Sequence, residues 1–132
     1  MNFKEFGKES NQTIMLLHGG GLNWWNYRQQ AKLLESDYHV IIPILDGHAG
    51  SDRQFTGIED NASHLIEFID RNLGGKVLLI GGLSLGAQIL LEMLSRRKDI
   101  CTFAIVENIF CTSTYNNEAF AAVSLFFNKI KL

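Results

Sequence analysis

The sequence of 132 residues has little of several residue types that define specialised protein classes. It contains one proline and no biased tract, which excludes collagen-like and low-complexity chains. Its two cysteines, Cys101 and Cys111, are too few for a disulfide framework and are spaced unlike zinc ligands. We therefore expect no metal, no cofactor and a reduced, cytoplasmic location.

Long apolar runs and charge of one sign are also missing. No apolar run approaches the roughly 18 residues of a membrane span, and the charged segment "MNFKEFGKES" is not a signal peptide. Twelve basic and fourteen acidic residues give a net charge of −2. The one basic cluster, Arg96–Lys98, falls where a helix should end and complements the helix dipole. These features predict a soluble protein with neither a nucleic-acid nor a membrane partner.

Apolar runs and helical patterns alternate along the chain. Four runs read as buried strands: Thr13–Leu17, His39–Leu45, Lys76–Gly81 and Cys101–Val106. Strands that alternate with helices are typical of a parallel sheet. The fold class that we predict is α/β, a single domain over residues 1–132 with a parallel sheet and helices on both faces.

Four helices are expected between and after these strands. One begins at Thr56, whose hydroxyl would cap it in a capping box with Glu59, and it ends at Gly74 and Gly75. Its apolar face leaves His64 on the opposite side, in solvent. Two more helices are expected at Trp25–Leu34 and Leu85–Arg97, and a last, mostly apolar helix from about Glu118.

A serine stands on a predicted turn between the third strand and the helix that follows it. Residues 82–86 read G-x-S-x-G, and in this context the motif places an exposed serine at the carboxyl end of the sheet. A phosphate-binding loop would need lysine and then serine or threonine after Gly86, where Ala87 and Gln88 stand. The motif therefore favours Ser84 as a nucleophile.

A second motif, "HGGG" at residues 18–21, follows the first predicted strand. Acyl-transfer enzymes place a backbone amide at such a loop to bind the tetrahedral oxyanion. We expect the backbone amides of Leu85 and Gly20 to be the two donors. The alternative is a turn without a catalytic role.

Together these motifs resemble the α/β-hydrolase family. The matching pieces are "LLHGGG" with Trp24 and Trp25 after it, "DGHAGSD" and "GGLSLGA", in the family's order, within Thr13–Val106. The resemblance implies a parallel-sheet fold, Ser84 as nucleophile and a small ester or thioester substrate. Trp24 and Trp25 would then line an acyl pocket, or else serve as packing residues.

The family's acid and histidine are the missing parts of the expected site. The resemblance implies a histidine late in the chain, but all four histidines precede Ser84. His48, in the "DGHAGSD" loop, is the candidate substitute base, and a structural role is the alternative. Glu107, directly after the fourth strand, is the candidate acid, and a plain surface carboxylate is the alternative. The family's last two strands are also missing, so the rival hypothesis is a non-catalytic domain that assembles with another chain.

The fourth strand, Cys101–Val106, would end the sheet with an unpaired edge. Such edges pair readily with other chains, and the apolar segment after residue 118 has more than one apolar side. We therefore predict a homo-oligomer.

Overall fold

A five-stranded sheet forms the centre of the molecule in the computed structural model, which describes residues 1–108. Its strands are β1 (Asn2–Phe6), β2 (Thr13–Leu17), β3 (His39–Ile44), β4 (Val77–Leu83) and β5 (Cys101–Glu107), in the spatial order β1-β3-β2-β4-β5. The strands β3, β2, β4 and β5 are parallel to one another, with registers such as Ile14 opposite Leu79. The predicted α/β fold class is thereby confirmed.

The first strand, β1, is the element that the sequence did not predict. It runs antiparallel to β3, with Phe3 opposite Pro43, and it forms one edge of the sheet. Most of its residues are exposed or half-buried, so it has neither an apolar run nor a clear alternation. Pairing with the fully buried strand β3, rather than its own sequence pattern, makes this segment a strand.

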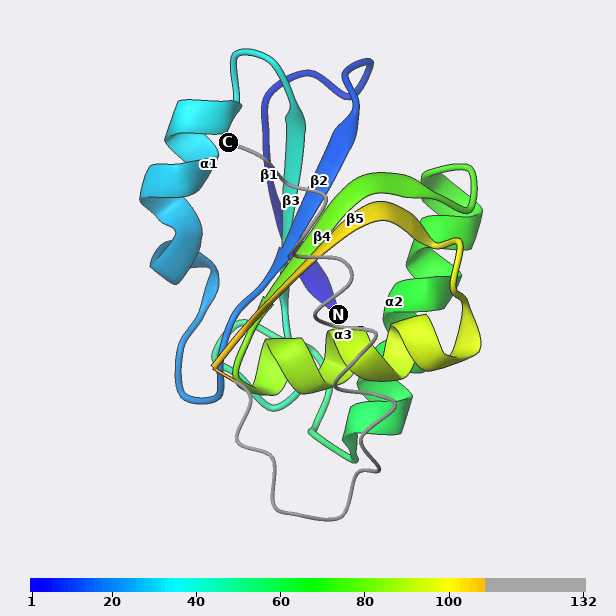
Figure 1. Cartoon of the computed structure of the whole chain (residues 1–132). Coiled ribbons are helices and arrows are strands. Elements are labelled where there is room, and N and C mark those ends of the chain that lie inside the picture. Colours follow the sequence, from blue (N-terminus) through cyan, green and yellow to red (C-terminus); the bar gives the residue numbers. More distant parts are fainter. Residues whose placement is uncertain (109–132) are drawn as a thin grey trace.

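Helices cover both faces of the sheet (Figure 1). On one face lie the 3₁₀ turn η1 (Trp24–Tyr27) and α1 (Arg28–Leu34), over a core that includes Ile14, Val40 and Ile42. On the other face lie α2 (Ile58–Asn72) and α3 (Leu85–Arg96), over a larger core that includes Met15, Ile41 and Leu90. The central strands β2 and β3 are thus buried from both sides, as their continuous apolar sequences require, whereas β5 at the edge has exposed residues.

The helix boundaries agree with the sequence except at the starts of α1 and α2. The helix predicted from Trp25 begins as the 3₁₀ turn η1, and α1 itself starts at Arg28. Gly74 and Gly75 end α2 in the left-handed region, with φ values of +70° and +84°, as predicted. The capping box predicted at Thr56 is wrong, because the N-cap residue is Gly57 and no side chain caps the helix. The apolar helix predicted from about Glu118 lies outside the described residues. None of the helices within residues 1–108 is long and apolar enough to cross a membrane.

Candidate functional site

Ser84 lies on the turn between β4 and α3, at the carboxyl end of the parallel strands. Its backbone has φ 53° and ψ −110°, a conformation that a side-chain-bearing residue adopts only under strain. The backbone amide of Ser84 donates to the carbonyl oxygen of Glu107 at 2.9 Å, which fixes the turn to the end of β5. The side chain caps nothing in α3 and is half-buried.

The two glycines of the G-x-S-x-G motif allow close backbone approaches around this turn. A Cβ atom on Gly86 would lie 2.2 Å from the carbonyl oxygen of Leu17, at the end of β2. A Cβ atom on Gly82 would lie 2.5 Å from the carbonyl oxygen of Gly86. Both distances are shorter than any real contact, so the first turn of α3 fits against β2 and β4 only with glycine at these positions.

The glycine loop, residues 18–21, lies against the serine turn. A Cβ atom on Gly19 would lie 3.5 Å from the Cβ of Ser84, and one on Gly20 would lie 3.9 Å from the side chain of Leu85. Gly19 is buried and Gly20 is exposed. The structure thus brings together Ser84 and the two residues, Leu85 and Gly20, whose amides the sequence predicts as oxyanion donors.

Two histidines connect the glycine loop to the loop after β3. The buried ring of His18 accepts the amide of Leu45 at Nε2 (3.2 Å), and its Nδ1 lies 3.0 Å from the carbonyl oxygen of Gly19. Burial lowers the pKa of His18 below its ordinary value, partly offset by the hydrogen bond to Gly19. The ring of His48 meets that of His18 edge to face at 4.8 Å.

The predicted base, His48, uses both ring nitrogens in contacts with backbone. Its Nε2 accepts the amide of Gly21 at 3.2 Å, and its Nδ1 lies 3.1 Å from the carbonyl oxygen of Asp46. Within residues 1–108 no histidine is hydrogen-bonded to Ser84 or to Glu107.

The predicted acid, Glu107, ends β5 beside Ser84, and its side chain is exposed. Its carboxylate also acts on Tyr27 of η1. Burial, followed by this negative charge, raises the pKa of Tyr27 to about 12. The end of β5, the 3₁₀ turn η1 and the serine turn therefore lie together at the carboxyl ends of the parallel strands.

Trp24 and Trp25, the expected pocket residues, have different surroundings. Trp24 packs near Phe6 of β1, with ring centroids 6.4 Å apart, and the Nζ of Lys4 lies 5.4 Å from its ring centre. Trp25 is 53% exposed. The contacts of Trp24 are those of a packing residue on the α1 face of the sheet.

Sequence reasoning missed a buried polar cluster around Asp46, directly after β3. The Asp46 carboxylate is fully buried, and it contacts His64 Nδ1 at 3.1 Å and the guanidinium of Arg53 at 3.6 Å. Its backbone amide donates to Asn61 of α2. The prediction that His64 lies in solvent is therefore wrong, because this ring turns toward the buried carboxylate. The "DGHAGSD" motif pointed to this loop, but no spacing rule pairs Asp46 with a residue 18 positions later.

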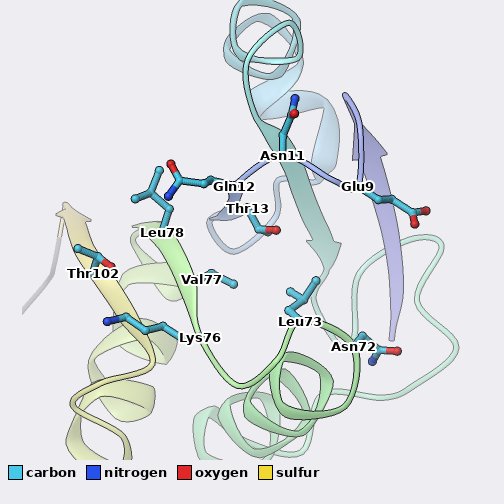
Figure 2. A pocket seen from close by; sticks show the side chains of 10 residues that line it. All are labelled: Glu9, Asn11, Gln12, Thr13, Asn72, Leu73, Lys76, Val77, Leu78 and Thr102. Atoms are coloured by element: carbon cyan, nitrogen blue, oxygen red, sulfur yellow. The ribbon is translucent and has the colours of Figure 1, made fainter.

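A cavity of about 500 Å³ lies at the amino ends of the parallel strands, opposite the serine site (Figure 2). Its side chains come from the β1–β2 loop, the end of α2 and the first residues of β2, β4 and β5, such as Thr13, Val77 and Thr102. In open α/β sheets ligands bind at the carboxyl ends of the strands, where Ser84 lies. This cavity is at the amino ends and contributes nothing to the serine site.

Within residues 1–108 no three His, Cys, Asp or Glu side chains form a group that could hold a metal ion. Cys101 is buried at the start of β5, and burial raises the pKa of its thiol to about 11. A thiol of this kind is a poor metal ligand and a poor nucleophile.

Known proteins resemble this chain over most of its length. The sequence model of the alpha/beta hydrolase family matches residues 14–129. Epoxide hydrolase 3 of Xenopus tropicalis is 27% identical over 106 residues, which are 77% of this chain and 29% of that protein. The chain therefore spans less than a third of this curated relative.

Solved structures agree with this result. An alpha/beta hydrolase family protein from Desulfitobacterium hafniense is 26% identical, with a TM-score of 0.73, over 81% of this chain and 44% of that protein. A thermophilic esterase from Thermogutta terrifontis is 24% identical, with the same TM-score, over 81% of this chain and 40% of the esterase. At this identity the esterase supports the fold alone, and the chain covers less than half of either protein.

Proposed function

This chain belongs to the alpha/beta hydrolase family, and from that premise we propose that it forms the nucleophile-bearing core of a serine hydrolase acting on carboxylic esters or thioesters. The single observation that carries the proposal is the position of Ser84. It stands at φ 53° between β4 and α3, with the glycine loop packed against it. Such strain is retained at functional sites because surrounding structure holds it in place.

The proposed chemistry is acyl transfer. The Oγ atom of Ser84 attacks the carbonyl carbon of the substrate while a base takes its proton, and the carbonyl oxygen becomes an oxyanion. The amides of Leu85 and Gly20 bind that oxyanion, aided by the amino terminus of α3. The protonated base gives its proton to the leaving oxygen or sulfur, and the alcohol or thiol departs to leave an acyl ester on Ser84. Water then hydrolyses this ester, which releases the carboxylic acid and restores the hydroxyl of Ser84.

The base and acid are the open parts of this proposal. Glu107 is the candidate acid, because β5 brings it beside Ser84. His48 is the weaker candidate for the base, because its Nε2 already accepts an amide hydrogen. A base contributed by another chain is the third possibility. Serine without a base is a weak nucleophile, since its hydroxyl keeps its proton at neutral pH.

A second candidate function is a non-catalytic domain that assembles with another chain. It is favoured by the sequence, in which every histidine precedes Ser84, and by the absence of a histidine bonded to Ser84 within residues 1–108. In this case the serine turn remains as a structural element only.

A homo-oligomer is proposed with either function. The strand β5 forms one edge of the described sheet, and its Phe103 side chain is 37% exposed. An edge strand with an exposed aromatic residue can pair with a second copy of the chain. Size-exclusion chromatography with light scattering tests this, and a monomer at high concentration would contradict it.

The function itself is tested by covalent labelling. The parent and Ser84→Ala are incubated with a reactive alkyl phosphonate, and intact mass is recorded over time. Stoichiometric labelling of the parent alone supports a serine hydrolase. A folded parent that gains no mass supports the non-catalytic domain instead.

A further inference from the structure

The glycine loop is held in place mainly by one other segment, the loop of residues 45–51. Three hydrogen bonds join residues 18–23 to that segment: the amide of Leu45 to His18 Nε2, the amide of Gly21 to His48 Nε2, and the side-chain amide of Asn23 to the carbonyl oxygen of Ala49. The first holds the start of the glycine loop, and the last holds Asn23, two residues beyond its end. The bond to His48 holds Gly21, the last residue of the loop, directly after Gly20.

From this arrangement we propose that His48 is a positioning residue, which sets the path of the glycine loop through the hydrogen bond between Gly21 N–H and its Nε2. The importance of this for catalysis rests on the proposed hydrolase function, in which Gly20 donates to the oxyanion. The positioning itself does not depend on that function.

The contacts of His48 specify its protonation state. Nδ1 faces two carbonyl oxygens, those of Leu45 at 3.2 Å and Asp46 at 3.1 Å, so this nitrogen carries the proton. Nε2 faces the N–H group of Gly21, so it must offer a lone pair. The ring therefore serves as the neutral Nδ1–H tautomer, and a lone pair engaged in this way is not free to take a proton from Ser84.

Protonation of His48 removes the acceptor on which the loop depends. A charged imidazolium donates at both nitrogens, so Nε2 and the amide of Gly21 would then repel each other. Among the described residues, the ring of His18 packs edge to face against His48, and burial lowers the pKa of His18. The carboxylate in the same loop, Asp46, is occupied by His64, Arg53 and Ser51.

Gly21 gains from an external support because its own backbone is not confined. Its φ is +73°, and no atom lies within 4 Å of the place where a Cβ would stand. The nearest internal bond of the loop joins the amide of Leu22 to the carbonyl oxygen of Gly19. Without His48, the backbone of residues 20 and 21 could rotate even while this hydrogen bond stays intact.

The experiment compares two variants of His48 with a matched control in ¹⁵N-labelled protein. His48→Gln keeps an acceptor at the position of Nε2, whereas His48→Phe keeps the ring packing on His18 without any acceptor. The control is His39→Gln, which alters another buried histidine whose ring contacts Thr13 and Glu5, away from the loop. The ring tautomer and the amide of Gly21 are followed by NMR between pH 5 and 8.

We expect His48 to be the Nδ1–H tautomer in the parent and in the control. In His48→Phe the amide of Gly21 exchanges about fivefold faster, the effect of losing one ordinary hydrogen bond, and in His48→Gln it stays near the parent rate. An Nε2–H tautomer, or a Gly21 amide that ignores His48, overturns the proposal.

Phosphonate labelling separates this proposal from the proposed function. If His48 positions the loop, His48→Phe labels more slowly than the parent and His48→Gln recovers the rate. If both variants lose labelling while the Gly21 amide is unchanged, His48 is the base and the positioning role is wrong. A parent that does not label overturns the hydrolase function, and the NMR measurements still decide whether His48 holds the loop.

Discussion

At the scale of single residues, the backbone conformation of Ser84 lowers the stability of the fold. Its φ of 53° with ψ −110° lies outside the regions that L-residues favour, and strain of this kind costs of order 1–3 kcal/mol. The hydroxyl makes no capping bond to α3 that would offset the cost. The strain therefore comes from a Cβ atom at this backbone conformation and not from the serine hydroxyl.

We expect Ser84→Gly to raise the free energy of unfolding by about 1 kcal/mol, because glycine adopts this backbone conformation without the steric cost. The gain is smaller than the strain itself, since glycine also makes the unfolded chain more flexible. Ser84→Ala keeps a Cβ, and so keeps the strain, and its free energy of unfolding should stay within about 0.5 kcal/mol of the parent. Urea unfolding of the three proteins measures both differences. Equal stabilities of the glycine and alanine variants would show that the turn is unstrained.

At the scale of elements, the close approach of α3 to β2 decides whether the serine turn can form. Gly86 lies in the first turn of α3, where alanine is intrinsically better than glycine by about 1 kcal/mol. The Cβ of an alanine would, however, lie 2.2 Å from the carbonyl oxygen of Leu17 and 2.8 Å from that of His18. Both neighbours are backbone atoms, so one of the two elements must move.

We therefore expect Gly86→Ala to lower the free energy of unfolding by about 2 kcal/mol, since overpacking a fitted contact outweighs the gain in helix propensity. The control is Ser95→Ala, at an exposed position of the same helix, which should raise it by about 0.5 kcal/mol or less. Urea unfolding distinguishes the two signs. A Gly86→Ala variant as stable as the Ser95→Ala variant would mean that α3 does not pack as closely on β2 as described.

The elements could be predicted from the sequence where the interior dictates the residue types. The strands β2 and β3 are continuous apolar runs because helices bury both of their faces, and β4 and β5 carry apolar residues that pack into the same two cores. The edge strand β1 carries no such signal, because half of its surroundings are water and its partner β3 supplies the order. The capping box at Thr56 had the right residue types, but the chain begins α2 two residues later, after an extended Gly57 with φ 164°.

The serine turn and the glycine loop could also be predicted, because their motifs encode local backbone geometry. The contacts among His18, His48, Asp46 and His64 could not, because each joins residues from separate elements. Which histidine faces a carbonyl and which faces an amide depends on how β2, β3 and α2 pack, and a single sequence holds no spacing rule for that.

At the scale of the whole molecule, the sheet separates two cores and buries polar side chains where the strands end. His18 is the clearest case, because it lies between the end of β2 and the loop after β3 with no exposed surface. Burial holds its pKa below the ordinary value of about 6.5, so folding favours the neutral ring. The neutral form also supplies the lone pair that the amide of Leu45 needs.

The depressed pKa of His18 makes the stability of the molecule depend on pH below about 6.5. As the pH falls from the unfolded pKa towards the lower folded pKa, the unfolded chain binds more protons at His18 than the folded chain does. The free energy of unfolding therefore falls with the pH in this window, by at most about 1.4 kcal/mol per pH unit from this group. His18 gives no such dependence above this range, where both states are neutral.

Urea unfolding of the parent and of His18→Gln at pH 7.5, 6.5 and 5.5 measures this contribution. We expect the variant to be less stable than the parent at pH 7.5. It should lose less stability on acidification, because glutamine can accept the amide of Leu45 without titrating. The matched control is His64→Gln, which removes a histidine that lies beside a carboxylate. On acidification the His64→Gln control should lose at least as much stability as the parent, whereas His18→Gln should lose less. Parallel pH profiles for the parent and His18→Gln would mean that His18 titrates alike in the folded and unfolded chains, and that its ring is not confined as the two joined loops require.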